Sequence, residues 1–384
     1  MGGLQAKAQK EVNLGLYVHV PFCASTCDFC AFYQETPHRR ELLNFLSAVE
    51  EEFQTFASGR PVETAFWGGG TPGLLPAGDL ERLGRAQVAA LGCPAREWTV
   101  EMAPSTVKAD KLAVLRGLGV SRISLGVQSF QDSMLESLGR RQSSRQALDA
   151  YRMIRDAGFD NVNIDLIFAV PGQTLELWLR DLGVVGELAP EHVSTYCLTF
   201  EEDTALYAKL AQGRIVLDVE REAEFYERTW EVLEAMGLRQ YEVSNFARPG
   251  TECSHNLDTW RMQEWIGFGP SAASQFDGRR FTNDANLEKW MAGVRNGVPA
   301  RMEDAELSDG ELALDSLVFG LRMNEGVDLA GLEERFPDFS AASVEPFLQE
   351  LVAEGLAGIQ GRRYVLTLAG RMVADRIGSE LLSG

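Results

Sequence analysis

The sequence predicts an α/β protein with a partial (β/α)6 barrel and a C-terminal winged-helix-like α+β module. Over the first half of the chain, short apolar segments of strand length alternate with amphipathic segments of helical spacing. This alternation implies parallel strands joined by right-handed crossovers. Near the C-terminus the pattern changes to short helical segments followed by a hairpin. A partial barrel of this kind places its chemistry at the carboxyl ends of the strands.

The predicted strands are short runs rich in apolar residues. They are Leu14–Val20, Val62–Trp67, Trp98–Met102, Arg122–Val127, Val162–Phe168 and His192–Thr199. The segments between them carry apolar residues three and four positions apart, which is typical of helices with one buried face. These helices are His38–Ala57, Asp79–Leu91, Val107–Leu118, Ser143–Ala157 and Leu175–Leu188.

The later part of the chain has a different pattern. Glu201–Val219 is predicted to be an insertion, Glu220–Met236 a long amphipathic helix and Tyr241–Ala247 a strand. Pro249–Arg280 is rich in glycine, tryptophan and small residues, which predicts a loop. An acidic boundary follows at Arg301–Glu311. The predicted elements after it are the helices Leu312–Leu321, Leu329–Phe336 and Val344–Glu354, the hairpin Leu356–Leu366 and the helix Ala369–Leu381.

We therefore expect three parts in the chain. Residues 1–245 form the barrel with a cysteine loop at 21–33, residues 246–304 form a Gly/Trp-rich connecting region, and residues 305–384 form the C-terminal module. Winged-helix modules often bind nucleic acid. Here the acidic charge favours a packing or docking role instead.

Composition limits the classes of function. The chain has 45% hydrophobic and 24% charged residues, as an ordinary soluble protein does. Its formal net charge of -20 disfavours a nucleic-acid partner, because phosphate binding needs a basic face. Met1–Asn13 is polar, unlike a signal peptide, and no apolar run approaches the roughly 18 residues that span a bilayer. The clustered cysteines suit a reducing cytoplasm.

Three cysteines follow the first predicted strand. Cys23, Cys27 and Cys30 form a C-x3-C-x2-C arrangement, which lets three thiolates converge on one soft metal centre. A disulfide would leave one thiol unpaired, and a zinc site usually adds a fourth cysteine or histidine. His19 and His38 leave zinc open as an alternative. An iron–sulfur cluster with three protein ligands and one open iron fits better, and such a cluster can bind and reduce a small chelating molecule.

Polar and glycine residues stand at or near the ends of the predicted strands. The stretch 68–71 reads Gly-Gly-Gly-Thr, where glycine allows close backbone approach to a ligand, although a triple glycine is more often a tight turn. Glu101 and Asp165 lie inside otherwise apolar strands, where a carboxylate needs a partner. Taken alone, Asp165 is more simply explained as a satisfied core aspartate. Gln128 ends the fourth strand, and Arg140 follows in the connection.

Together these stretches resemble the oxygen-independent coproporphyrinogen III oxidase group of radical S-adenosylmethionine proteins. That group includes the oxidases and the haem chaperones of the HemW type, and the resemblance runs from about Leu16 to the C-terminus. It implies a radical S-adenosylmethionine core whose three cysteines hold a 4Fe–4S cluster, with Tyr17 beside it. The implied contacts to S-adenosylmethionine at the open iron are Gly69, Gly70, Thr71 and Glu101. The implied contacts to a second S-adenosylmethionine or to the adjacent substrate space are Gln128, Arg140 and Asp165.

Two departures separate this chain from the oxidases and are shared with the haem-chaperone branch. Phe32 stands where similar oxidases carry a further cysteine, and sixteen residues precede Tyr17 where they carry a long extension. The resemblance therefore implies a cytoplasmic haem chaperone that passes haem to an acceptor protein. The alternative is an enzyme that uses a 5′-deoxyadenosyl radical to oxidise a porphyrinogen propionate, with the cofactors carrying the reaction.

Haem iron needs an axial ligand, usually His, Cys, Met or Tyr. The haem-chaperone branch carries an H-N-x-x-Y-W stretch, and residues 255–260 read His-Asn-Leu-Asp-Thr-Trp, with threonine in place of the tyrosine. His255 is the best candidate ligand, with Cys253 in reserve. The alternative is that His255 satisfies buried backbone in a glycine-rich loop. Two histidines common in the branch are replaced by Gln142 and Ala273, which weakens the haem prediction and leaves the cluster prediction untouched.

The implied partners are haem, an unidentified acceptor protein and, if the chain is catalytic, an electron donor. Membrane contact would be peripheral and would arise through the acceptor. An RNA-modifying radical enzyme is disfavoured by the acidic charge. Cys93 and Cys197 are predicted to be ordinary buried thiols.

Overall fold

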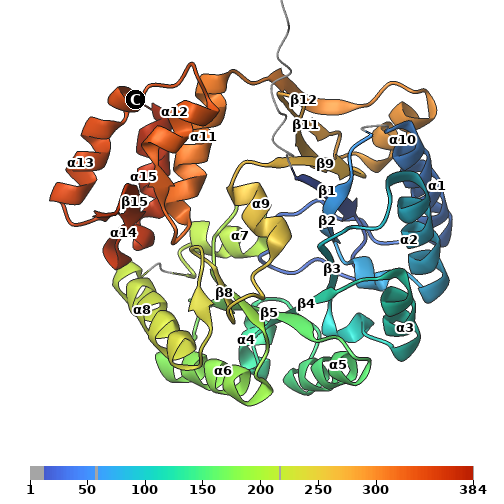
Figure 1. The fold of residues 1–384 in the computed structure, drawn as a ribbon. Helices are drawn as coiled ribbons and strands as arrows, with labels where there is room; N and C mark the ends of the chain where they lie inside the picture. The colour runs from blue at the N-terminus through green and yellow to red at the C-terminus, as the bar shows by residue number, and fades with distance from the viewer. Residues whose placement is uncertain (1–12, 57–58, 216–217, 384) are drawn as a thin grey trace, which may run out of the picture.

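The structure, a computed structural model, describes residues 13–56, 59–215 and 218–383 (Figure 1). Residues 1–12 of the predicted polar N-terminal stretch and part of the predicted insertion at Glu201–Val219 lie outside the described residues. Within the described residues, the longest sheet has twelve strands in the order β12-β11-β10-β9-β1-β2-β3-β4-β5-β6-β8-β7. Its two ends do not meet, so the barrel is open.

The six strands at the centre of this sheet follow one another in sequence order and pair in parallel. They are β1 (Leu14–Val20), β2 (Val62–Gly69), β3 (Glu97–Met102), β4 (Arg122–Gln128), β5 (Asn161–Phe168) and β6 (His192–Cys197). Most of their side chains are buried, as expected for parallel strands covered on their faces. The predicted partial barrel is confirmed.

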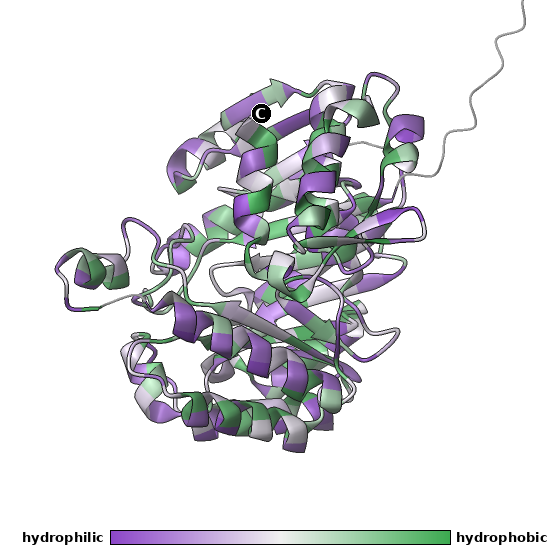
Figure 2. Ribbon diagram, turned by 90° about the vertical axis from the view of Figure 1, so that its left-hand side faces the viewer, coloured by the Kyte–Doolittle hydropathy of each residue, from purple (hydrophilic) through white to green (hydrophobic). Residues whose placement is uncertain are grey.

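Helices follow the strands and pack around the outside of the sheet (Figure 1). They are α1 (Arg39–Thr55), α2 (Ala77–Leu91), α3 (Ala109–Leu118), α4 (Asp132–Ser137), α5 (Ser144–Asp156), α6 (Leu175–Leu188) and α8 (Val219–Ala235). The short helix α7 (Ala205–Ala211) lies instead against the cysteine loop. In the helices nearest the viewer, Figure 2 shows both hydrophilic and hydrophobic residues, which is typical of helices with one buried face. The short helices α4 and α7 were not predicted. No helix among the described residues is both long enough and apolar enough to cross a membrane.

The sheet extends beyond the six predicted strands at both edges. Beside β1 lies β9 (Glu264–Phe268), which pairs with it in parallel and is followed by antiparallel β10 (Ala273–Phe276), β11 (Arg279–Asn283) and β12 (Arg301–Glu306). Beside β6 lies β8 (Asn245–Ala247), followed by β7 (Arg239–Gln240). The helices of this region are α9 (Ser254–Trp260) and α10 (Leu287–Arg295).

The prediction of a loop over Pro249–Arg280 is therefore wrong. Glycines in a sequence suggest irregular backbone, but Gly267 allows close strand contact, because a Cβ there would lie 2.4 Å from the carbonyl oxygen of Ala273. Two further predictions need correction. Tyr241–Ala247 is the turn and second strand of the β7–β8 hairpin, and the acidic boundary at Arg301–Glu311 contains β12.

The C-terminal module has its own hydrophobic core and a small sheet in the order β13-β15-β14. Its elements are α11 (Asp309–Arg322), β13 (Val327–Asp328), α12 (Leu329–Arg335), α13 (Glu345–Ala353), β14 (Ala357–Gln360), β15 (Arg363–Leu366), α14 (Leu368–Met372) and α15 (Ala374–Ser383). The helix predicted over Ala369–Leu381 is interrupted at Val373. The module is joined to the barrel at the β7–β8 hairpin, where Asn324 donates to the Gln240 carbonyl at 2.7 Å.

Candidate functional site

A cavity of about 950 Å³ lies at the carboxyl ends of the central strands. It is lined by the cysteine loop after β1, the glycine turn after β2, polar residues of β3, β4 and β5, and residues of the C-terminal module. The predicted site residues that line it are Cys23, Cys27, Cys30, Gly69, Gly70, Thr71, Glu101, Gln128, Arg140 and Asp165. Tyr17 and His255 are not among the lining residues. The topology thus brings most of the predicted residues into one space.

The cysteine loop is held at its base and in its middle. Phe22 and Glu35 form a bridge that closes the base. In the middle of the loop, the backbone N–H of Asp28 donates to the Leu138 carbonyl at 3.1 Å, and the Asp28 carboxylate pairs with Lys209 of α7 at 2.7 Å. The thiols are therefore positioned by contacts of their loop with α4 and α7. No local pattern in the sequence predicts these contacts.

The three thiols face one end of the cavity. The sulfur of Cys23 lies 3.4 Å from Oγ1 of Thr71. Burial raises the pKa of the Cys23 and Cys27 thiols, and the neighbouring Arg140 guanidinium opposes that rise. A nearby cation favours the thiolate, which is the form that binds metal. All six cysteines of the chain lie in its described part and are free, so these thiols are available as ligands.

The donors fit an iron–sulfur cluster better than a single zinc ion. Among the described residues, no three Cys, His, Asp or Glu side chains form a group that could hold one metal ion. In a four-iron cluster each thiolate binds a different iron, so the three sulfur atoms need not meet at one metal ion. The two histidines that could have completed a zinc site have other surroundings. His19 bonds through both ring nitrogens to Tyr17 and to the Tyr33 carbonyl, and His38 is exposed at the start of α1.

The glycine turn after β2 packs directly against β1 and the cysteine loop. Gly69 has a φ of 99°, and a Cβ there would lie 2.6 Å from the His19 ring. A Cβ on Gly70 would lie 2.7 Å from the carbonyl oxygen of Phe22, and the N–H of Thr71 donates to that same oxygen at 2.8 Å. These glycines are therefore required for backbone packing, in addition to the predicted approach to a ligand.

Two carboxyl groups face the cavity close to each other. Burial and, second, the Asp165 carboxylate raise the pKa of Glu101 to about 8, while the N–H of Gly69 acts in the opposite direction. Burial also raises the pKa of Asp165, against the hydrogen bonds that it accepts. Paired carboxyls in a desolvated space favour a cationic ligand, whose charge would stabilise the ionised forms. The sulfonium and ammonium groups of S-adenosylmethionine are such cations.

Hydrogen bonds also hold the side chain of Asp165 in place. Its Oδ2 accepts from the Ser124 hydroxyl at 3.0 Å, and its Oδ1 accepts from Asn163 Nδ2 at 2.8 Å. The predicted alternative of a satisfied core aspartate is thus correct for its hydrogen bonds. The same side chain lines the cavity, so both interpretations apply to one residue.

A bulge at the end of β4 sets the position of Gln128, and Arg140 lies beside it. The register with β5 shifts after Gly126, and Gln128 has a φ of 69°, an uncommon conformation that is enriched at functional sites. A Cβ on Gly126 would lie 3.2 Å from Gln128 Nε2 and 3.7 Å from Arg140 Nη2, so the glycine leaves room for both. Gln142 donates to the carbonyls at 126 and 127, at 3.3 and 3.0 Å, and stabilises the bulge.

Tyr17 packs behind the cavity wall. Its hydroxyl donates to Nδ1 of His19 at 3.3 Å, because Nε2 of His19 donates to the Tyr33 carbonyl at 3.2 Å. Its ring stacks on Phe66 with centroids 6.3 Å apart. Burial raises the pKa of Tyr17 and lowers the pKa of His19 to about 4, so both stay neutral near pH 7.

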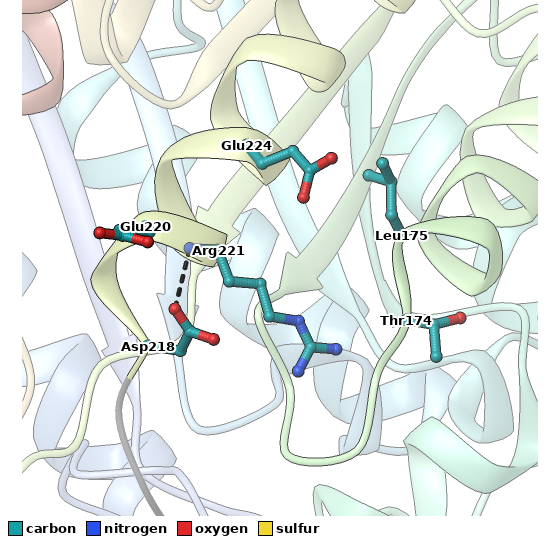
Figure 3. Close-up of a pocket in the computed structure, with 6 residues that line it drawn as sticks. All are labelled: Thr174, Leu175, Asp218, Glu220, Arg221 and Glu224. Carbon is teal, nitrogen blue, oxygen red and sulfur yellow. Dashed lines mark hydrogen bonds between the residues drawn. The ribbon is translucent and has the colours of Figure 1, made fainter.

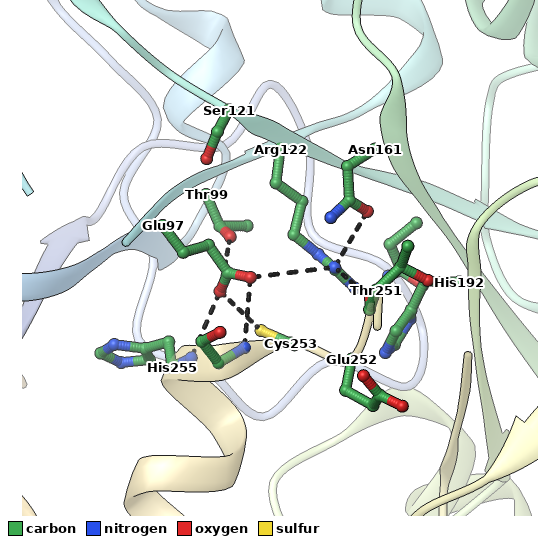
Figure 4. A network of polar contacts seen from close by, with 12 residues as sticks. Glu97, Thr99, Ser121, Arg122, Asn161, His192, Thr251, Glu252, Cys253 and His255 are labelled. Carbon is green, nitrogen blue, oxygen red and sulfur yellow. Dashed lines mark hydrogen bonds and ion pairs between the residues drawn. The ribbon is translucent and has the colours of Figure 1, made fainter. Parts of the chain in front are cut away.

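The structure places His255 and Cys253 at the amino-terminal ends of the strands, opposite the cysteine loop. His255 Nδ1 bonds to Thr64 at 2.9 Å, and its backbone N–H donates to Glu97, the first residue of β3, at 3.2 Å (Figure 4). The Cys253 thiol donates to the same Glu97 carboxylate at 3.3 Å. Burial lowers the pKa of His255 to about 4 and raises the pKa of Cys253. These contacts favour the alternative that His255 satisfies buried groups over a role as a haem ligand.

Several cavity residues were not predicted. Cys93, predicted to be a buried thiol, is exposed, so that prediction is wrong. Cys197 is partly buried against the core, as predicted in part, and also lines the cavity at the end of β6. Tyr196 also lines the cavity. Arg322 of α11 and Asp375 of α15 reach it from the C-terminal module. No local pattern marks these last two, because only the docking of the module places them there.

A second, smaller pocket lies on the surface between α6 and the start of α8 (Figure 3). Asp218 there accepts from the backbone N–H of Arg221 at 3.1 Å and caps α8. Its other lining residues include Glu220 and Glu224 on the same helix. The capped and solvated start of α8 is sufficient to explain this pocket.

Comparison with known proteins agrees with this geometry. The Radical SAM superfamily matches residues 17–182, and the HemN C-terminal domain matches residues 307–373. A Radical SAM domain implies a 4Fe–4S cluster and S-adenosylmethionine. Both are the groups that the three thiols and the paired carboxyls fit.

Curated relatives match most of the chain. Heme chaperone HemW of Bacillus subtilis (strain 168) is 32% identical over 368 residues, which cover 94% of this chain and 97% of that protein. Heme chaperone HemW of Escherichia coli (strain K12) is 36% identical over 291 residues, which cover 73% and 76%. A mitochondrial protein of Bos taurus, named radical S-adenosyl methionine domain-containing protein 1, is 33% identical and covers 100% of this chain and 90% of its own length.

A solved structure confirms the fold. Coproporphyrinogen III oxidase (HemN) from Escherichia coli, described as a radical SAM enzyme, superposes with a TM-score of 0.83 at 24% identity, covering 97% of this chain and 90% of that chain. At this identity the likeness concerns the fold alone. It confirms the predicted partial-barrel fold.

Proposed function

Because the chain belongs to the family of the HemW heme chaperones, within the Radical SAM superfamily, we propose that it is a haem chaperone that binds haem and transfers it to an acceptor protein. In this proposal Cys23, Cys27 and Cys30 hold the 4Fe–4S cluster at one end of the cavity. When bound, the cluster and S-adenosylmethionine supply one-electron chemistry. The protein supplies the enclosed space and the charges around it.

The remaining residues have defined tasks in the proposal. Glu101 and Asp165 would neutralise the positive charges of S-adenosylmethionine, since both carboxyls are desolvated and face the cavity. Gln128, at the bulge of β4, and Arg140, after α4, would bind its polar edge or the adjacent ligand, because both line the same space. Gly69, Gly70 and Thr71 would shape the wall between the ligand and the cluster loop.

One observation carries the proposal beyond the family relationship. The cavity continues from the thiols past the paired carboxyls to the C-terminal module, and its volume of about 950 Å³ is near the top of the roughly 300–1,000 Å³ typical of small-molecule sites. The residues assigned to S-adenosylmethionine occupy one part of its lining. The rest leaves room for a second, larger ligand such as haem.

The alternative function is oxidation of coproporphyrinogen by a radical mechanism. It is favoured by the convergence of Glu101, Gln128 and Asp165 beside the thiols, an arrangement that would also serve catalysis. Phe32 argues against it, because this side chain lines the cavity, is 71% exposed and stands where the resembling oxidases carry a further cysteine. A radical formed in a site open to water would be exposed to side reactions.

The proposal includes a location and partners. Free, clustered cysteines favour a reducing cytoplasm. The acidic charge favours a protein acceptor over nucleic acid, and membrane contact would come through that acceptor. An electron donor is needed only if the protein catalyses radical chemistry.

The test compares haem transfer with porphyrinogen oxidation. Anaerobically reconstituted protein is titrated with haem, followed by its absorption spectrum, and then mixed with apomyoglobin as a probe acceptor. In parallel it is given coproporphyrinogen III, S-adenosylmethionine and dithionite. We expect saturable haem binding, transfer to apomyoglobin and no protoporphyrinogen. A yield of protoporphyrinogen above that of the cluster-free Cys27→Ser variant would support the alternative, and the absence of saturable haem binding would reject the chaperone function.

A further inference from the structure

The β6 side of the cavity is built by the barrel and the C-terminal module together. Its lining residues are Leu198 after β6, Tyr226 on α8, Val243 in the β7–β8 turn, Arg322 at the end of α11 and Asp375 on α15. None of these residues belongs to the predicted S-adenosylmethionine contacts. This side is the part of the lining to which no ligand has been assigned.

Arg322 has hydrogen-bonding capacity to spare. Its Nη1 bonds to Asp375, whose side chain is 90% exposed, whereas the side chain of Arg322 is only 20% exposed. Its Nε is buried and has no hydrogen-bond partner. A guanidinium can bind a carboxylate through two of its N–H groups. Because Nε of Arg322 is itself shielded from solvent, a carboxylate would meet this side chain through its terminal nitrogens, in exchange with the exposed Asp375.

The guanidinium is also held in place. Its Cζ lies 5.3 Å from the ring centroid of Trp260, at the end of α9. Stacking of this kind restrains the side chain, so less conformational entropy is lost when it binds a ligand. Arg322 therefore resembles a preorganised anchor more than a solvated surface arginine.

Charged side chains of both signs line the cavity. Glu101 and Asp165 make one part acidic, which suits the cations of S-adenosylmethionine and repels carboxylates. Arg140 and Arg141 also line the cavity, and on the β6 side the positive charge belongs to Arg322, which Asp375 partly balances. A ligand that carries carboxylates would direct them toward this arginine and away from the acidic pair.

The walls on the β6 side suit a flat apolar ligand. Leu198 and Val243 are apolar, and Tyr226 presents an aromatic ring whose phenol stays neutral because burial raises its pKa. Apolar and aromatic walls with few fixed polar groups are typical of cofactor sites. Haem combines a flat apolar ring with two propionate carboxylates at one edge.

We propose that the β6 side of the cavity binds the porphyrin, and that Arg322 of the C-terminal module binds a propionate carboxylate. This inference rests on the proposed haem-chaperone function and adds a location and an anchor to it. It also gives the module a task, because Arg322 completes a site that the barrel alone does not contain.

The test measures haem affinity in three variants by absorption titration. We expect Arg322→Gln to weaken haem binding roughly tenfold or more, because a charge-assisted contact is lost. Asp375→Asn removes the competing carboxylate and should leave the affinity equal or higher. Arg376→Gln is the matched control, since this arginine of α15 is 59% exposed and pairs with Glu380. It should bind haem as the unmodified protein does.

A second measurement keeps the inference testable if Arg322→Gln folds poorly. The unmodified protein is titrated with haem and with iron protoporphyrin IX dimethyl ester in the same detergent solution. We expect the ester to bind roughly tenfold more weakly, and Arg322→Gln to remove this difference.

Three results would overturn the assignment of Arg322. They are equal binding of haem and the ester by the unmodified protein, unchanged haem affinity in Arg322→Gln, and equal weakening by Arg322→Gln and Asp375→Asn. The last result would mean that the ion pair is structural. Failure of the unmodified protein to bind haem at all would instead reject the proposed function, so the two failures are distinguishable.

Discussion

Gly70 lies directly against Phe22, the residue before the first cysteine. A Cβ on Gly70 would be 2.7 Å from the carbonyl oxygen of Phe22 and 2.8 Å from its backbone nitrogen. The N–H of Gly70 also donates to the carbonyl of Val20, at 2.9 Å. The glycine turn and the cysteine loop are therefore parts of one packed unit.

The first prediction follows from this contact. Gly70→Val should reduce both cluster content and S-adenosylmethionine binding, because the new side chain meets rigid backbone of the cysteine loop. The contact with S-adenosylmethionine implied for Gly70 would by itself predict an effect on ligand binding alone. Iron and sulfide analysis after anaerobic reconstitution, with equilibrium dialysis of S-adenosylmethionine, measures both. Full cluster content in Gly70→Val would show that the loop can move away from the turn without losing its geometry.

The second prediction concerns the cluster itself. Anaerobically reconstituted protein should hold about four irons and four sulfides, and Cys23→Ser, Cys27→Ser or Cys30→Ser should each remove most of them. The reason is that each residue supplies one of three thiolates facing the same end of the cavity. Cys93→Ser is the control, because this exposed thiol lies outside the cavity. Stoichiometric zinc without iron uptake would contradict the prediction.

The third prediction is a pH dependence of S-adenosylmethionine binding. Burial and Asp165 raise the pKa of Glu101 to about 8, so the carboxyl is mostly protonated in the free protein at pH 7. A cationic ligand favours the carboxylate, and binding therefore releases a proton. Affinity should rise by up to about tenfold per pH unit between about pH 6 and about pH 7.5, and should level off above pH 8. Calorimetry in buffers of different ionisation enthalpy measures the released proton.

Glu101→Gln supplies the control for this pH dependence. The amide has the same shape but no titrating proton, so binding should be weaker and nearly independent of pH over that range. The cluster should remain assembled, because Glu101 does not contact the cysteines in the structure. A pH-independent affinity in the unmodified protein would show that Glu101 does not meet a ligand cation.

How much of the fold the sequence could predict depended on local patterns. The central strands and helices were found because each is bounded by a change in periodicity, and α6 was predicted at its observed limits, Leu175–Leu188. β9 and β10 were missed, because a short strand that contains Gly267 has the composition of a loop until its partner strand is known. Pairing between segments distant in the chain leaves little local signal.

The candidate site could likewise be predicted only where local patterns mark its residues. Residues at strand ends could be predicted, because parallel strands place their carboxyl ends at one edge. Arg322 could not, because it reaches the cavity only through the docking of a separate module. His255 was linked to haem by a motif, but its contacts to Thr64 and Glu97 place it at the other end of the strands.

The last prediction separates a structural from a ligating role of His255. His255→Ala should destabilise the protein by about 2–4 kcal/mol, because it removes the hydrogen bond to Thr64 and the ring packed on Phe66 at 5.4 Å. The absorption maximum of bound haem should stay unchanged, since the side chain does not line the cavity. His38→Ala, at an exposed position, should alter neither quantity. Denaturant unfolding and the haem spectrum measure the two effects separately. A shifted spectrum at unchanged stability would make His255 a haem ligand and would mean that the haem-bound protein opens the amino-terminal end of the strands.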